Sequence, residues 1–263
     1  MAQYSAHRNE HFNTSNSDVH EVVMLADKDG NILNTSGSAS NIPIAAGLVD
    51  GYGHINKFGA SDGDITAGTI WDGNSGTTVY PYPANSVVAV ASGSNAGANV
   101  YIEGLDASYN AQSETVAIGA SGTKTFSRIF RAYMVDTNND ADVTMSLSST
   151  VVAKIIEDNN QTLMSVYTIP AGKTGYLMKL QLGSDKASTN SAMQYSVMTK
   201  EITDGGIFRI KGRFYAAGGQ NVIVEYPVPI KINEKTDIRV DCIAAQQATV
   251  SATFDIILVD NNA

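Results

Sequence analysis

Residues 207–215 read Ile207-Phe-Arg-Ile-Lys-Gly-Arg-Phe-Tyr215, and this stretch shows the pattern that decides the fold. Basic side chains at positions 209, 211 and 213 share one parity, while Phe208, Ile210 and Phe214 share the other. Successive side chains of a β-strand point to opposite faces. The alternation therefore predicts a strand that buries one face and exposes the other to water.

Similar strand signals recur along the chain from residue 42 onward. Runs of β-branched and aromatic residues are separated by Gly, Asn, Asp and Ser, which is typical of antiparallel β proteins. Apart from a short turn at 127–133, no stretch keeps a helical period, so we expect little helix. The predicted strands are 86–91, 99–105, 114–118, 126–135, 151–156, 162–169, 175–182, 193–201, 207–215, 221–228, 236–243 and 249–259.

These strands favour an all-β fold, an antiparallel β-sandwich of the jelly-roll type, over a closed barrel. We expect the sandwich to cover residues 96–263, and a smaller β element rich in Gly and aromatic residues to cover 41–95. Residues 1–40 are polar and predict an extended amino-terminal arm. Within the arm, the turn sequence Asp27–Asn31 between apolar runs predicts one hairpin.

Composition excludes several classes of protein. The 263 residues carry a net charge of −9, which argues against binding to a nucleic-acid backbone. The longest apolar runs are too short to span a membrane, and residues 1–18 lack the apolar core of a signal peptide. The single cysteine, Cys242, lies in a β-like run and is expected to be a small buried hydrophobe.

Two motifs resemble metal sites but lack parts that such sites need. His7-Arg-Asn-Glu10-His11 matches an inverted zinc-protease pattern, yet it lies in a polar terminus without the required helix. Asp136–Asp142 spaces oxygen ligands as a calcium loop does, but Ala141 and Leu147 replace the required Gly and Glu. We interpret the first as coincidence and the second as a solvated hairpin loop, and we predict no metal site.

The sequence offers no convincing catalytic group. There is no nucleophile elbow and no phosphate-binding glycine loop, and all four histidines precede residue 55. Glu157 and Asp158 are adjacent, so on a strand they would point to opposite faces. We therefore expect a protein that is not an enzyme, with no catalytic residues and no cofactor.

Several short motifs resemble structural proteins of tailed bacteriophages, in particular those of marine and cyanobacterial phages. The strongest is Asn56-Lys-Phe-Gly59 followed by Ile70-Trp-Asp-Gly73, which is similar to the family's NKFG…IWDG pattern. The resemblance implies an all-β virion component without catalysis, and does not distinguish head from tail. Further matching segments are 100–106, 112–115, 159–162, 167–174 and 254–261.

Aromatic residues gather near this pattern and in the arm, and two interpretations of them stay open. Large rigid side chains between glycines are typical interface anchors, but most aromatic residues are core residues. In the second interpretation Trp71 and Phe58 close one end of the sandwich. The candidate interface residues are Tyr4, Phe12, Phe58, Trp71, Tyr80 and Tyr82.

These observations favour a decoration or cement protein on the exterior of a phage capsid. We expect it to be made in the host cytoplasm, to form a homotrimer, and to bind neighbouring subunits of the major capsid protein, without nucleic-acid or membrane partners. Unpaired strand edges and the polar arm would be completed by neighbouring subunits. The alternatives are a tail, neck or fibre component that contacts the host surface, and a virion-bound depolymerase.

Overall fold

The computed structural model describes residues 25–26, 32–33, 41–185, 192–202, 206–217 and 219–262. The chain divides into two compact units, residues 1–48 and 49–263. In the first unit, β1 (Leu25–Ala26) pairs antiparallel with β2 (Ile32–Leu33), where the turn sequence predicts a hairpin, and α1 spans Asn41–Ala45. The rest of the predicted arm, including Tyr4, Phe12 and the His7–His11 motif, lies outside the described residues.

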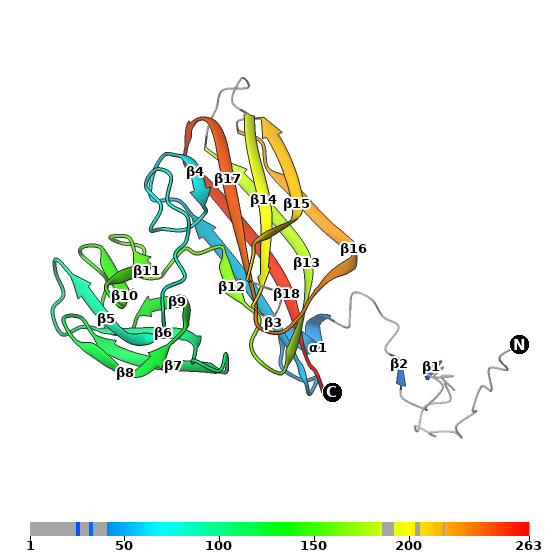
Figure 1. The fold of residues 1–263 in the computed structure, drawn as a ribbon, viewed down its shortest axis with the longest axis horizontal. Helices are drawn as coiled ribbons and strands as arrows, with labels where there is room; N and C mark the ends of the chain where they lie inside the picture. Colours follow the sequence, from blue (N-terminus) through cyan, green and yellow to red (C-terminus); the bar gives the residue numbers. More distant parts are fainter. Residues whose placement is uncertain are drawn as a thin grey trace, which may run out of the picture. The chain divides into compact units, whose positions relative to one another are not determined.

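The second unit contains two β-sandwiches, which we call the large and the small sandwich (Figure 1). The large one is built from two sheets, one ordered β16-β13-β18-β3 and the other β12-β17-β14-β15 with β4 also paired to β17. Its strands are β3 (Tyr52–Ala60), β4 (Ile65–Thr69), β12 (Val166–Thr168), β13 (Lys173–Ser184), β14 (Ala192–Glu201), β15 (Arg209–Ala217), β16 (Val222–Ile232), β17 (Thr236–Ala248) and β18 (Val250–Asp260).

In the large sandwich, β4 and β12 act as two halves of one strand. Both pair antiparallel with β17, β4 along Asp241–Ala248 and β12 along Asp237–Arg239. Counted as one, they complete eight strands whose order in the two sheets is that of a jelly roll. The predicted all-β, jelly-roll-like sandwich is therefore confirmed.

The small sandwich is inserted between the two halves of this interrupted strand. Its sheets are ordered β11-β10-β5-β8 and β7-β6-β9, and it is drawn in green tones in Figure 1. Its strands are β5 (Ser86–Ser92), β6 (Asn99–Leu105), β7 (Ala111–Ala117), β8 (Ser121–Phe126), β9 (Arg128–Met134), β10 (Val143–Leu147) and β11 (Thr150–Ile155).

This arrangement divides the chain differently from the sequence-based expectation. Residues 41–95 do not form a separate element, because β3 and β4 belong to the large sandwich and β5 belongs to the small one. Likewise, 96–263 is not one sandwich, since an insertion takes up its first part. The strand predicted at 126–135 is confirmed as β9, which spans Arg128–Met134, and the short helical turn allowed at 127–133 does not form.

Each sandwich has its own hydrophobic core. The large core contains Tyr195, Phe254 and Leu180, all fully buried between the two sheets. The small core contains Trp71, Phe126 and Met145. Burying one such side chain contributes about 1.5–3 kcal/mol, so each sandwich gains substantial stability from its own interior.

Cys242 lies in the large core on β17 and is 0% exposed, as its β-like run predicts. Burial, with a smaller contribution from the charge of Asp241, raises the pKa of the thiol to about 12. Since the thiolate is the reactive form, we expect the folded protein at pH 8 to resist a disulfide reagent such as dithionitrobenzoate. The urea-unfolded protein should react completely. Fast stoichiometric labelling of the folded protein would contradict this placement of Cys242.

Candidate functional site at the junction of the two sandwiches

The inserted sandwich leaves and rejoins the large one at two adjacent points, Ile70 and Ser165. The amide of Ile70 donates to the Val240 carbonyl at 2.9 Å, and the amide of Val240 donates to the Ser165 carbonyl at 3.2 Å. The amide and hydroxyl of Ser165 both donate to the Ile70 carbonyl, at 3.1 and 2.5 Å. The two connections are thus fastened to each other and to β17. We call the surrounding region the junction: residues 56–59, 70–82, 128–131, 162–168, 200, 208 and 237–241.

The Ile70-Trp-Asp-Gly73 segment places neighbouring side chains in different cores. Ile70 packs in the large core and Trp71 in the small core. The Asp72 carboxylate accepts a hydrogen bond from the Leu163 amide at 2.7 Å, and burial raises the pKa of this carboxyl well above its usual value. A Cβ on residue 73 would lie 2.2 Å from the Trp71 ring, so a glycine is required there. The turn therefore links the two cores.

The Asn56-Lys-Phe-Gly59 segment lies on β3 and meets the same region from the other side. The Lys57 ammonium donates to the backbone carbonyl of Phe130 on β9, in the small sandwich. Gly59 passes so close to the connection that a Cβ there would lie 2.2 Å from the Ser165 amide nitrogen. Both halves of the phage-like pattern thus sit where the two sandwiches meet.

A buried cluster of charges joins β9 to β17 and β14. Arg128 donates from Nε and Nη2 to the two oxygens of Asp237, at 2.8 and 3.0 Å. The same carboxylate accepts from Thr168 Oγ1 at 2.7 Å and lies 2.9 Å from the Lys200 ammonium. Asp237 is 0% exposed. A buried carboxylate held by two cations and a hydroxyl is well compensated, and it fixes the small sandwich to the large one.

Aromatic rings extend this cluster from the small core toward the surface. Trp71 and Tyr80 stack edge to face at 5.1 Å, and so do Tyr80 and Tyr82. The Lys200 ammonium lies 4.1 Å from the centre of the Tyr82 ring, and the Arg239 guanidinium lies 3.9 Å from the centre of the Phe208 ring. These cation–π contacts further stabilise the two cations.

The candidate interface residues fall into three groups. Trp71 and Tyr80 are almost fully buried core residues, which supports the core interpretation and corrects the interface assignment for these two. Tyr82 is half-buried in the junction, and Phe58 is half-buried on β3. Tyr4 and Phe12 lie outside the described residues. The sequence pattern did not single out Arg128, Lys200 or Asp237.

The acidic segment Asp136–Asp142 forms the loop between β9 and β10. Its carboxylates turn to different parts of the protein: Asp136 accepts from Asn99 at 2.6 Å, and Asp142 pairs with Lys154 at 2.7 Å. They do not converge on one point. Over the described ranges, no group of three or more His, Cys, Asp or Glu side chains is placed to hold a metal ion. Among the described residues no helix is long and apolar enough to cross a membrane.

Comparisons with known proteins give weak matches to virus particles. The chain is similar to a structure of infectious bursal disease virus, Gx strain, at 11% identity and a TM-score of 0.26, covering 81% of this chain and 71% of that one. A crystal structure of the VP2 subviral particle of the same virus matches at 10% identity and a TM-score of 0.24, covering 81% and 73%. No protein-family model and no curated protein matches the chain.

The geometry of the junction is that of a rigid joint. The Asp237 carboxylate is bound from both sandwiches, by Arg128 on β9 and by Lys200 on β14, and the rings of Trp71 and Tyr80 pack edge to face. Paired, buried charges hold two bodies in a defined orientation, because separating them would leave each charge uncompensated. The small sandwich is thus held in a fixed orientation on the jelly roll.

Proposed function

We propose that this chain is a non-enzymatic structural protein of a virus particle. The observation that carries the proposal is the eight-stranded jelly-roll order with a second sandwich inserted into one strand. Jelly rolls recur in viral capsid proteins, lectins and cupins. In this chain large apolar side chains fill the space between the two sheets. A binding site for a partner would therefore lie on the outer surface of the sandwich. The resemblance of Asn56–Gly59 and Ile70–Gly73 to phage structural proteins favours a viral structural protein over a lectin or a cupin.

Within that class, the decoration role on the capsid exterior is our first choice. A net charge of −9 suits a position away from packaged nucleic acid. The partners would be the major capsid protein and two further copies of this chain. A tail, neck or fibre component that contacts the host surface is the second candidate, because a rigidly held outer sandwich suits host contact equally well.

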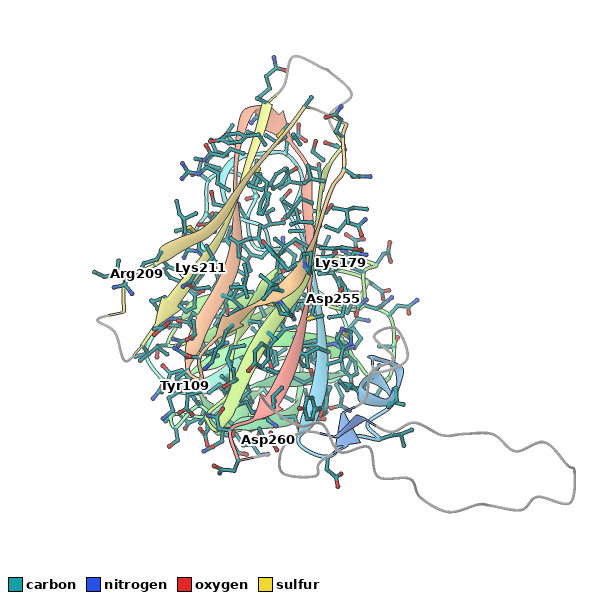
Figure 2. The ribbon with its side chains drawn as sticks, turned by 90° about the vertical axis from the view of Figure 1, so that its right-hand side faces the viewer. Tyr109, Lys179, Arg209, Lys211, Asp255 and Asp260 are labelled. Carbon is teal, nitrogen blue, oxygen red and sulfur yellow. The ribbon has the colours of Figure 1, made fainter. Side chains whose placement is uncertain are left out.

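Two edge strands of the large sandwich, β15 and β16, are poorly suited to strand pairing with a neighbour. β15 carries the exposed cations Arg209, Lys211 and Arg213, and Figure 2 shows Arg209 and Lys211 projecting from it. β16 contains Pro227 and Pro229. Edge cations and prolines discourage the addition of another strand. Contact with a capsid would therefore use faces of the sheets in place of these two edges.

One such face is the outer side of the sheet that contains β14, β15 and β17. Gln194 lies opposite both Tyr215 and Ile243 in the strand register, so the three side chains form one row. Tyr215 is 67% exposed and Ile243 is 56% exposed. Exposed aromatic and aliphatic side chains on a rigid sheet are typical anchors of a protein interface.

Replacing both anchors, Tyr215→Ser with Ile243→Ser, should weaken binding to undecorated capsids about 30-fold or more, because loss of an interface hot spot removes about 2 kcal/mol or more. The stability of the free subunit should change by less than about 0.5 kcal/mol per site. Cosedimentation with capsids measures the affinity. Val228→Ser, at an 82% exposed apolar position on β16, is the matched control and should bind normally. Equal binding by all three proteins would remove this face from the interface.

The position of the chain in the particle tests the function itself. Cryo-electron microscopy of intact virions should place density for this chain on the outer surface of the head, in groups of three. Density confined to the tail or fibres would replace the decoration role with the second candidate. Density on the inner capsid surface against nucleic acid, or the absence of the chain from purified particles, would overturn the proposal.

A further inference from the structure

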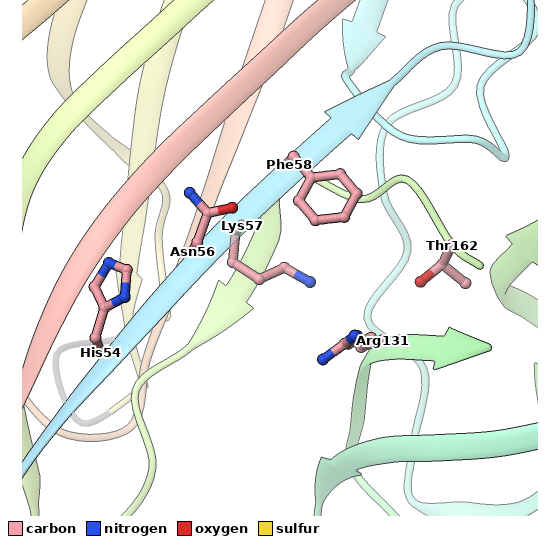
Figure 3. Close-up of a pocket in the computed structure, with 6 residues that line it drawn as sticks. All are labelled: His54, Asn56, Lys57, Phe58, Arg131 and Thr162. Carbon is pink, nitrogen blue, oxygen red and sulfur yellow. The ribbon is translucent and has the colours of Figure 1, made fainter. Parts of the chain in front are cut away.

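A cavity of about 330 Å³ opens between β3 of the large sandwich and β9 of the small one. It is lined by His54, Asn56, Lys57, Phe58, Arg131 and Thr162. Figure 3 shows the Lys57 side chain extending from β3 into the space that faces Arg131 and Thr162. Two of the lining side chains are therefore cations that approach from opposite sandwiches.

Lys57 is buried in an unusual way for a lysine. It is 7% exposed, and its ammonium donates to the Phe130 carbonyl. Within the described part of the chain it has no carboxylate at salt-bridge distance. Burial, followed by the positive charge of Arg131, lowers the pKa of Lys57 to about 7. An ammonium has three donors, so two of them remain for a ligand.

The remaining lining groups differ in how strongly they are engaged. His54 and Asn56 both bind Asp255, at 3.1 and 2.7 Å. The Arg131 guanidinium lies 5.1 Å from the centre of the Tyr133 ring and 3.9 Å from Glu103, and its side chain is 48% exposed.

Thr162 also has a donor to spare. Its hydroxyl oxygen accepts from the Ala132 amide at 3.1 Å, which leaves the hydroxyl proton free to donate. Uncommitted donors thus come from Lys57, Arg131 and Thr162.

We propose that this cavity binds a small oxyanion, of the size and charge of sulfate, phosphate or a carboxylate. An oxyanion accepts charge-assisted hydrogen bonds from an ammonium, a guanidinium and a hydroxyl together. It also supplies the negative charge that a buried ammonium otherwise lacks. The space is several times the volume of a water molecule, roughly 30 Å³, so the ion fits with part of its hydration. This site is independent of the proposed function, since it needs no capsid partner.

Sulfate is the probe of choice because its charge does not change between pH 6 and 9. Isothermal titration of the full chain with sodium sulfate, at constant ionic strength made up with chloride, should give saturable binding to one site. Lys57→Met should weaken binding at least tenfold, and Arg131→Gln should weaken it several-fold. Lys124→Gln removes a charge from an exposed lysine on β8 and should leave binding unchanged. Unsaturable binding, or equal affinity in all variants, would overturn the proposal.

The wild-type protein provides a test that does not depend on a variant's folding. The charged groups around Lys57 are Arg131 on β9, Glu103 on β6 and Asp72 in the turn. Since the bound form needs a protonated Lys57, sulfate affinity should fall about tenfold per pH unit above pH 7. In parallel, bound sulfate should raise the pKa of Lys57 followed by NMR of its side chain. A constant affinity and an unchanged Lys57 titration would exclude Lys57 from the site.

Discussion

Replacing Asp237 with asparagine should lower the free energy of unfolding by about 3–5 kcal/mol, which is the usual loss when one partner of a buried ion pair is removed. The carboxylate is fully buried and holds Arg128, Lys200 and Thr168. An asparagine has nearly the same shape but no charge. Both cations would therefore lose this counter-ion, and the Arg128 side chain, which is only 9% exposed, would stay buried without one.

Urea unfolding followed by tryptophan fluorescence measures this loss. Trp71 is the single tryptophan of the chain and lies in the small core, so its signal reports on the inserted sandwich. Asp142→Asn is the matched control, because Asp142 is 45% exposed and Lys154 keeps Asp62 as a partner. The control should change stability by about 0–1 kcal/mol. A loss below about 1 kcal/mol for Asp237→Asn would mean that the cluster does not hold the two sandwiches together.

Several of the strands that cover a core were predictable from the sequence because their side chains alternate between a buried and an exposed face. Residues 99–105 form β6 with the predicted bounds, and 193–201 differs from β14 by one residue. Ser121–Phe126, which forms β8, was not predicted. It is an edge strand of the small sandwich with one buried side chain, so its sequence carries almost no apolar signal.

The junction could not be predicted from this alternation of buried and exposed side chains. Along β17, Asp237 and Arg239 alternate with Ile238 and Val240, which by itself indicates a strand with one wet face. In the structure all four residues are buried, because the charged face of β17 takes part in the junction with the inserted sandwich. The spacing of apolar residues along β17 does not indicate that a second sandwich covers its polar face.

The interruption of one jelly-roll strand was equally invisible in the sequence. β4 and β12 are short, and nearly one hundred residues separate them, yet both pair with β17. Trp71 was recognised as important, but one of its neighbours in space comes from the far end of the insertion. Its backbone forms a bridge with Met164, a contact that no spacing rule predicts.

Gly59→Ala should strongly destabilise the protein. A Cβ at this position would lie 2.2 Å from the Ser165 amide nitrogen, 2.7 Å from the Ile70 carbonyl oxygen and 2.8 Å from the Met164 carbonyl carbon. All three atoms are backbone, so no side-chain rotation relieves the contact. Overpacking that forces backbone shifts costs about 1–3 kcal/mol and sometimes more. Here the shift would also strain the hydrogen bonds between Ser165 and Ile70.

Gly53→Ala on the same strand separates this steric effect from the general effect of removing a glycine. Nothing lies within 4 Å of a Cβ at position 53. Alanine restricts the unfolded chain more than glycine does, so this variant should be neutral or more stable by about 0.5–1 kcal/mol. In thermal unfolding, the melting temperature of Gly59→Ala should therefore be lower than that of the wild type. The melting temperature of Gly53→Ala should be the same as that of the wild type or higher. If Gly59→Ala unfolded like Gly53→Ala, β3 could not pass as close to the two connections as the structure places it, and the tight joint between jelly roll and insertion would have to be abandoned.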